Sequence, residues 1–289
     1  MKGSRRKRLF NPIKDQSSAF TLVELLVVVA VLALLASIVF SNLTGAREQA
    51  KISNALSFQS NMHNLLGADL VGWWNFDEGS GSVANDLSGY GNNGTLSDFD
   101  FNDSSGWSND TPSPSGHSLR FDGVDDYLIL GNKIGSFIDN SVTISAWIKP
   151  DSSGSREISN QGQWDGGPWT GWRFRQISSR INLKIGDNTL TSYELSAGTL
   201  EFGNWQHVVG SWDGRHIKLY IDGLNVGNEA KELTLQMNSG QHYIGKYAGS
   251  AYFFNGLIDD VRIYSRALTA YEVQTLYAQT KDNYLSNRY

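Results

Sequence analysis

One carboxylate in this sequence lies where a carboxylate is costly. Glu24 is the only charged residue between positions 20 and 40, a run of otherwise uncharged and mainly apolar residues. At about 1.5 Å per helical residue the run measures about 30 Å, the thickness of a bilayer core. A charge inside such a segment is expensive, so we expect Glu24 to have a functional partner. The alternative is an ordinary membrane anchor with an acid near one end.

A second group of residues could bind sugars. Trp164, Asp165, Trp169 and Trp172 lie close together in a glycine-rich stretch. Aromatic faces stack on the apolar faces of sugar rings, and carboxylates accept hydrogen bonds from their hydroxyl groups. The sequence therefore predicts a glycan-binding surface at these four residues. The alternative is that the tryptophans fill a core, as buried aromatic residues commonly do.

Familiar catalytic patterns do not occur in the sequence. The chain has no cysteine, which excludes thiol catalysis and cysteine-bound metals. Its five histidines are scattered without metal-ligand spacing, and there is neither a Gly-x-Ser-x-Gly elbow nor a strand with alternating carboxylates. Residues 89–94 fit Gly-x-Gly-x-x-Gly, but the pattern indicates a turn because no strand and helix surround it. We therefore predict that the protein is not an enzyme.

The residues before the apolar run set its orientation. Segment 1–19 carries six basic residues and one acidic residue. By the positive-inside tendency this end stays in the cytoplasm, and the rest of the chain is exported. Good helix formers continue beyond residue 40, and Gly67 offers a helix stop. We expect one helix over 20–67, with its transmembrane half at about 20–40.

This region resembles the class III signal of type IV pilins and pseudopilins, in which a short basic leader precedes a small residue and then Phe-Thr-Leu-x-Glu-Leu. The matching residues are Ala19, Phe20, Thr21, Leu22, Val23, Glu24 and Leu25. The resemblance implies that a prepilin peptidase cleaves between Ala19 and Phe20 and that Phe20 becomes N-methylated. It also implies that Glu24 of a neighbouring subunit pairs with the new amino terminus. Ala19 departs from the usual glycine, which predicts slower processing; the alternative is an uncleaved anchor.

The residue pattern after position 67 is typical of an all-β domain. Short runs of β-branched and aromatic residues alternate with turn residues, and apolar residues in the run 142–148 alternate with Thr143, Ser145 and Trp147. Residues 97–116 indicate a mobile surface loop. Thr269 and Glu272 match a capping box and predict a short helix to about residue 280. The expected fold is mainly β, with an antiparallel sandwich over 68–280 and a tail at 281–289.

Six segments between about residues 70 and 279 follow one another in a recognisable order, namely 71–79, 86–94, 119–127, 205–208, 219–223 and 254–268. Their order resembles the laminin-G-like, concanavalin A-like jelly-roll family. It implies a jelly-roll sandwich. It implies little about function, because the family includes glycan binders, adhesion modules and hydrolase appendages.

The same resemblance implies a structural calcium ion. Carboxylate and carbonyl oxygens from strand ends and loops suit this ion, and we predict Asp77 and Asp259 as the ligand pair. Period-two alternation places Asp259 on the side of Val261 and Ile263, facing the core, where its carboxylate needs a partner. The alternative is that Asp259 caps a turn or pairs with an arginine.

The net charge of the chain also limits which functions are plausible. The whole chain has a net charge of −5, and the part after residue 19 would carry 18 basic and 28 acidic residues, a net charge of −10. This balance argues against nucleic-acid binding and is compatible with an exported surface.

From these observations we predict a structural and adhesive subunit of a type IV pilus or secretion pseudopilus. It would sit in the bacterial inner membrane with a cytoplasmic amino terminus and an exported head. Its expected partners are other pilin-like subunits, the prepilin peptidase, the lipid bilayer, and glycans or surface proteins. Two alternatives remain, a membrane-anchored lectin-like protein and an anchored glycoside hydrolase.

Overall fold

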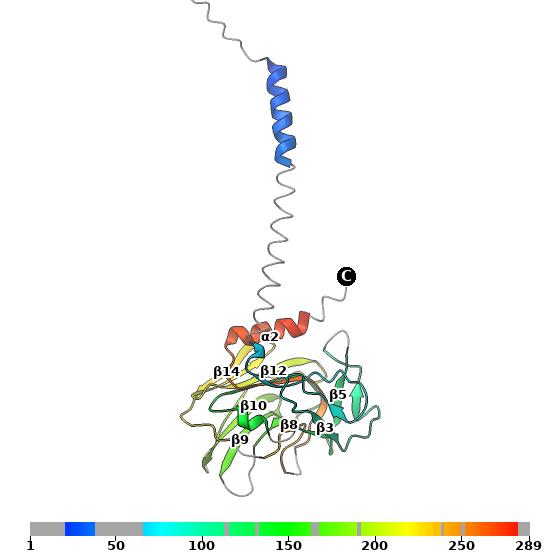
Figure 1. Ribbon diagram of the computed structural model, residues 1–289, viewed down its shortest axis with the longest axis vertical. Coiled ribbons are helices and arrows are strands. Elements are labelled where there is room, and N and C mark those ends of the chain that lie inside the picture. Colours follow the sequence, from blue (N-terminus) through cyan, green and yellow to red (C-terminus); the bar gives the residue numbers. More distant parts are fainter. Residues whose placement is uncertain are drawn as a thin grey trace, which may run out of the picture. The chain divides into compact units, whose positions relative to one another are not determined.

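The computed structural model describes most of the region after residue 65 and one segment before it (Figure 1). The described residues are 21–37, 66–112, 116–130, 133–162, 168–189, 192–237, 240–249 and 252–282. The chain divides into two compact units, Met1–Asn61 and Met62–Tyr289.

The first unit contains a helix at residues 22–37, and every side chain of that helix is exposed. No helix within the described ranges combines the length and the hydropathy that crossing a membrane requires. The predicted helix over 20–67 falls largely on residues 38–65, outside the described residues; residues 66 and 67 are helical.

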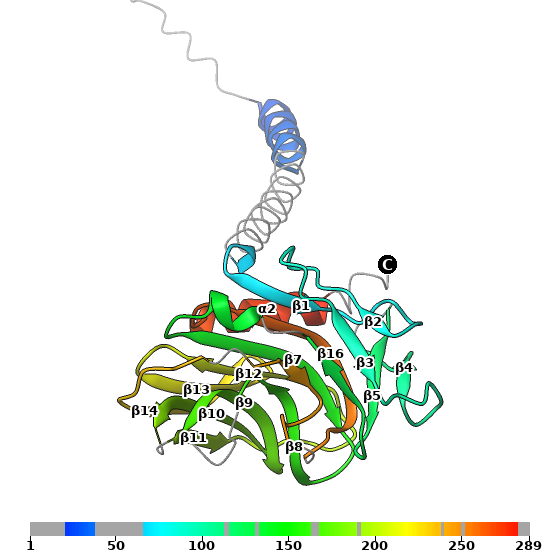
Figure 2. The same ribbon diagram turned by 60° about the horizontal axis from the view of Figure 1, so that its bottom comes forward.

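The second unit is a sandwich of two antiparallel sheets, as predicted (Figure 2). Sheet A has the strand order β14-β13-β12-β7-β16-β5-β4, with β1 paired to β16. Its strands are β1 (Leu70–Trp74), β4 (Gly106–Ser108), β5 (Ser118–Asp122), β7 (Val142–Pro150), β12 (Gln206–Trp212), β13 (His216–Ile221), β14 (Leu224–Ala230) and β16 (Asn255–Tyr264).

Sheet B has the strand order β11-β10-β9-β8-β15-β6-β3-β2. Its strands are β2 (Val83–Ala84), β3 (Gly94–Ser97), β6 (Tyr127–Ile129), β8 (Gly154–Asn160), β9 (Trp169–Ser178), β10 (Arg180–Thr189), β11 (Ser192–Ala197) and β15 (Tyr243–Ile244). A short 3-10 helix, η1 (Ile134–Phe137), precedes β7.

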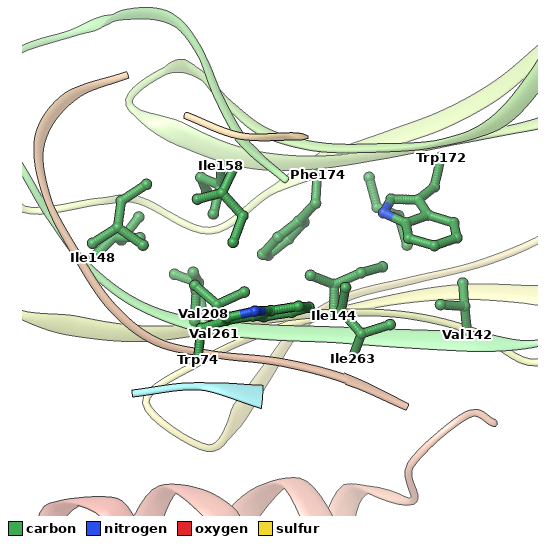
Figure 3. Close-up of a cluster of buried hydrophobic side chains, with 14 of the residues drawn as sticks. Trp74, Val142, Ile144, Ile148, Ile158, Trp172, Phe174, Val208, Val261 and Ile263 are labelled. Carbon is green, nitrogen blue, oxygen red and sulfur yellow. The ribbon is translucent and has the colours of Figure 1, made fainter. Parts of the chain in front are cut away.

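The core lies between the two sheets (Figure 3). Because side chains alternate along a strand, β7 directs its apolar set into this core and Thr143, Ser145 and Trp147 to the opposite face. Sheet B supplies Ile158, Trp172 and Phe174 from the other side (Figure 3). The predicted alternation of the run 142–148 is confirmed.

The outer face of sheet A is covered in part by α2 (Ala270–Asp282) (Figure 1). Its start is the predicted capping box, in which the Thr269 N–H donates to Glu272 Oε2 at 2.7 Å and the Glu272 N–H donates to Thr269 Oγ1 at 3.2 Å. A second apolar cluster joins α2 to the sheet and is formed by Leu66, Val209, Tyr220, Tyr264, Leu268, Val273 and Leu276.

A bulge in β16 corrects the predicted orientation of Asp259. The pairing of β16 with β7 shifts between Asp259 and Arg262, and Asp260 has a left-handed backbone with φ 46°. The extra residue breaks the period-two alternation, so Val261 and Ile263 lie in the core whereas Asp259 lies opposite Trp147 on the outer face. The prediction that Asp259 faces the core was therefore wrong.

Candidate functional site

The structure brings the two predicted calcium ligands, Asp77 and Asp259, into one small pocket on the outer face of sheet A. The pocket has a volume of about 120 Å³ and is lined by Trp73, Asp77, Trp147, Asp259, Asp260 and Arg262, together with Asn75, Pro112 and Thr280. Strands β1, β7 and β16 and helix α2 supply most of these side chains. We call it the Asp259 pocket.

Asp259 is buried and accepts two hydrogen bonds from the protein. Asp259 is only 4% exposed. Thr111 Oγ1 donates a hydrogen bond to Asp259 Oδ2 at 2.6 Å, and the Asp260 N–H donates one to Asp259 Oδ1 at 2.7 Å. Burial raises the pKa of Asp259 well above its usual value, and the nearby carboxylates of Asp260 and Asp77 also raise it. The site therefore favours a protonated carboxyl at Asp259.

The remaining charges of this pocket also have partners. Asp260 Oδ1 accepts hydrogen bonds from Trp73 Nε1 at 2.7 Å and from Arg262 Nε at 3.0 Å. The guanidinium of Arg262 lies 4.6 Å from the centre of the Trp73 ring. Asp77 accepts from the His117 N–H at 3.2 Å and from Asn75 Nδ2 at 2.5 Å.

These contacts bear on the predicted calcium ion. All four oxygens of Asp77 and Asp259 already accept protein hydrogen bonds, and the Arg262 cation lines the same pocket. Each of these oxygens keeps a second lone pair, so a calcium ion would not have to displace the donors, but it would be repelled by the Arg262 charge in the same pocket. The arrangement suits a hydrogen-bonded network better than a calcium site, and calcium binding by this pair stays a prediction.

A second acidic group was not singled out from the sequence. Asp122, Asp125 and Asp126 are the one set of three metal-ligand side chains within the described ranges whose ligand atoms lie within 4.8 Å of one another. Asp126 accepts from Ser105 Oγ at 2.7 Å and from the Asp122 N–H at 2.9 Å, and burial raises its pKa to about 6. Its carboxyl therefore orders the turn before β6 and the loop that carries Ser105.

The predicted glycan-binding residues divide into two groups. Trp164 and Asp165 lie outside the described residues. Trp172 is fully buried in the core, with its ring 5.4 Å from that of His242. Trp169 is 5% exposed; Tyr247 stacks on its ring, and Lys184 Nζ lies 4.6 Å from the ring centre. The assignment of Trp172 as a sugar-stacking residue is corrected, because no face of its ring is accessible, and Trp169 likewise packs against protein.

Trp169 borders a charged cluster on the outer face of sheet B. Arg173 Nε donates to the buried carboxylate of Glu157 at 2.6 Å, and its guanidinium lies 4.1 Å from the centre of the Tyr247 ring. Next to it on β9, Arg175 donates to Asn182 Oδ1 at 2.9 Å. Burial raises the pKa of Glu157, although the Arg173 charge opposes this shift. No local sequence pattern marks this cluster, because its members come from three strands, β8, β9 and β10, and from the segment after β15.

Two serine–histidine pairs are buried, one between α2 and the outer face of sheet A and one in the core between the sheets. Ser145 Oγ lies 2.8 Å from His207 Nε2, and Ser159 Oγ lies 2.8 Å from His242 Nε2. Burial lowers the pKa of both histidines to about 3, so both rings are neutral. Among the described residues neither Nδ1 has a hydrogen-bond partner, so no carboxylate orients either ring as in a catalytic triad.

At the amino-terminal helix, Glu24 makes contacts that the sequence reading missed. Its Oε2 accepts from the Thr21 N–H at 2.9 Å and from Thr21 Oγ1 at 2.8 Å, and the Glu24 N–H donates to Thr21 Oγ1 at 3.3 Å. Thr21-x-x-Glu24 is thus a capping box, a pattern that the sequence does contain. Ala19 and Phe20 lie outside the described residues.

Comparison with known proteins identifies two regions. Residues 122–274 match the family described as the concanavalin A-like lectin/glucanases superfamily, and residues 14–40 match the prokaryotic N-terminal methylation motif. Over 153 residues the chain is 25% identical to adhesion G-protein coupled receptor V1 of Danio rerio. The aligned region covers 50% of this chain but only 2% of that receptor.

Solved structures with the same fold include binding domains. Domain 4 of AbnA, an extracellular arabinanase of Geobacillus stearothermophilus, was solved in complex with arabinotriose; it is 21% identical and aligns with a TM-score of 0.56 over 72% of this chain and 98% of that domain. The binding domain of Paraclostridial Mosquitocidal Protein 1 is 17% identical and aligns with a TM-score of 0.57 over 74% of this chain and 53% of that one. At these identities the likeness concerns the fold alone.

Proposed function

Because this chain belongs to the concanavalin A-like lectin/glucanases superfamily and also carries an N-terminal methylation motif, we propose that it is a pilin-like subunit of a type IV pilus or secretion pseudopilus. In this proposal the sandwich is a binding head. The observation that carries it is the presence of both regions in one chain, at 14–40 and 122–274. A signal for assembly and a binding-type fold together describe a displayed adhesive module.

The described part of the first unit supports assembly through its helix. Its large apolar side chains are all well exposed, from 47% at Val28 to 76% at Leu22. So much exposed apolar surface needs lipid or other helices around it. We infer that the lipid bilayer and other pilin-like subunits are its partners, with the amino terminus on the cytoplasmic side of the inner membrane and the head exported.

The head is proposed to bind glycans or surface proteins rather than to catalyse a reaction. Carboxylates of Asp77 and Asp259 do face one pocket, as a glycoside hydrolase would need. However, its volume of about 120 Å³ is below the roughly 300 Å³ at which small-molecule pockets begin. An anchored hydrolase would release reducing sugar from a polysaccharide, and the Asp77→Asn variant would abolish that release.

Mass spectrometry of the mature amino terminus tests the pilin assignment. We expect co-expression with a prepilin peptidase to yield a chain that begins with methylated Phe20. The matched variant Ala19→Gly should be processed faster, because it restores the usual residue before the cut. A chain that keeps its leader in both variants would instead be an anchored lectin-like protein.

A further inference from the structure

We propose that a groove at the β4 edge of sheet A binds a neutral oligosaccharide. The inference rests on the proposed function of the head and adds where the ligand binds and what its charge is. The groove has a volume of about 540 Å³ and is lined by Phe101, Asn102, Asp103, Trp107, Asn109 and Arg120, together with Ser108 and residues 79–81. This volume lies within the range of about 300–1,000 Å³ that is typical of ligand pockets. We call it the Phe101 groove.

Two aromatic rings supply apolar surface in this groove. Phe101 is 50% exposed even though its backbone is left-handed, with φ 53°. A phenylalanine in this backbone region is strained by about 1–3 kcal/mol, and such strain concentrates at ligand sites. Trp107 is half-buried and fixed by a hydrogen bond of 2.8 Å from its Nε1 to the Gly81 carbonyl. Sugar rings have apolar faces that stack on exposed aromatic rings of this kind.

The loop that carries Phe101 is held in place from beneath. Asn102 and Ser105 form an antiparallel bridge, with the Asn102 N–H donating to the Ser105 carbonyl at 2.9 Å. Ser105 Oγ donates to the buried Asp126 carboxylate at 2.7 Å and accepts from the Asp100 N–H at 3.0 Å. These bonds order the loop before any ligand arrives, which lowers the entropy cost of binding.

The polar groups of the groove suit hydroxyl groups better than a charged ligand. Asn102, Asp103 and Asn109 are exposed; the two amides donate and accept hydrogen bonds, and the Asp103 carboxylate accepts them. Arg120 is the one cation among the lining residues, and its Nη2 already pairs with Asp151 at 3.0 Å. Asp103 supplies one negative charge, so the groove has little net charge. An anionic sugar would therefore gain no attraction here, whereas a neutral sugar would bond its hydroxyl groups.

The test uses the full chain in detergent micelles with cellotriose, maltotriose, mannotriose and sialyllactose as probes. We expect saturation-transfer NMR and calorimetry to detect at least one neutral trisaccharide and to show weaker binding of sialyllactose. Phe101→Gly removes the ring and relieves the left-handed backbone, so it should keep the wild-type unfolding temperature within a few degrees. It should weaken neutral binding about tenfold or more.

The control is Tyr271→Ala, which removes an aromatic ring that is 57% exposed on α2, outside the groove. It should leave the affinity unchanged. Asp103→Asn should narrow the difference in affinity between the neutral probes and sialyllactose, because it removes the carboxylate that repels the sialic acid charge. Full affinity in Phe101→Gly, or a preference for sialyllactose, would overturn the inference. If wild type binds none of the probes, the inference also fails, while a methylated Phe20 would still support the pilin assignment.

Discussion

At the scale of single residues, Asp259 has the clearest pH-dependent contribution to stability. Burial raises its pKa in the folded state, so between the ordinary aspartate pKa and the raised one the folded protein holds a proton that the unfolded chain has lost. The free energy of unfolding therefore falls as pH rises through this interval and stays lower above it. Burial of this carboxyl therefore lowers the stability of the head at neutral pH.

We predict that Asp259→Asn stabilises the head at neutral pH and flattens this pH dependence. An asparagine can accept from the Asp260 N–H and donate to the Thr111 hydroxyl, so both contacts survive without the charge. A gain of about 1 kcal/mol would raise the unfolding temperature by about 2–4 °C, measured by circular dichroism between pH 4 and 8. The exposed Asp139→Asn is the control and should change nothing.

The same measurement tests the predicted calcium pair. If Asp77 and Asp259 hold calcium, Asp259→Asn should lower the unfolding temperature, and a chelator should lower that of the wild-type protein but not of the variant. Stabilisation by the asparagine, with no effect of the chelator, would remove the calcium assignment.

Glu24 is expected to have two separable roles. Glutamine can replace glutamate in a capping box, so Glu24→Gln should keep the helix start while removing the charge that pairs with a neighbouring amino terminus. We predict loss of filament assembly with unchanged insertion in the membrane, measured by electron microscopy and membrane fractionation. Thr21→Ala instead removes the cap, at a cost of about 1 kcal/mol, and keeps the charge. Normal filaments in Glu24→Gln would contradict the pairing role.

Predictions for single residues were right where they rested on a few consecutive residues, and wrong where they rested on regular alternation along a whole strand. The Thr269 and Glu272 capping box needed four consecutive residues and was confirmed. The direction of Asp259 required every strand residue to alternate, and the bulge at Asp260 broke that assumption. Aspartate tolerates the left-handed backbone of residue 260, but this preference alone does not predict a bulge, which depends on the pairing of β16 with β7.

At the scale of elements, the buried pair of Glu157 on β8 and Arg173 on β9 links two strands of sheet B. Glu157 is fully buried, and the Arg173 side chain is 8% exposed. We predict that Glu157→Gln destabilises the head by about 3–5 kcal/mol, because it leaves the arginine charge buried without its counter-ion. Urea unfolding would measure this loss.

A surface pair provides the matched control for that measurement. Arg120 and Asp151 are 31% and 35% exposed, so Asp151→Asn should cost less than about 1 kcal/mol. Replacing both buried partners by apolar residues, in Glu157→Leu with Arg173→Met, should recover much of the loss. Equal effects of Glu157→Gln and Asp151→Asn would show that the pair contributes little.

Loops were the least predictable elements. The sequence of residues 97–116 indicates a mobile surface stretch, whereas its described residues include β4, a bridge between Asn102 and Ser105, and the ring of Phe101. These features depend on Asp126, Gly81 and β5, which all lie outside the stretch, so its own composition could not show them. The sandwich was predictable because strand alternation repeats many times, but the groove depends on single long-range contacts.

At the scale of the whole molecule, the head begins before its first β-strand. The second unit starts at Met62, earlier than its first strand at Leu70. Leu66 is 5% exposed within the apolar cluster of α2, and Asp69 pairs with Arg266 and accepts from the Ser265 N–H at 2.8 Å. The residues just before β1 therefore belong to the packing of the head.

We predict that a fragment 62–289 unfolds cooperatively and is more stable than a fragment 70–289 by about 3 kcal/mol. Burial of one leucine contributes about 1.5–3 kcal/mol and a backbone hydrogen bond about 1 kcal/mol. Urea unfolding of the two fragments measures the difference. Leu66→Ala in the longer fragment is the matched variant and should reproduce most of the loss, because it removes the leucine side chain while keeping Asp69. Equal midpoints for the two fragments would place the start of the folded head at β1 and would leave Leu66 outside its cooperative core.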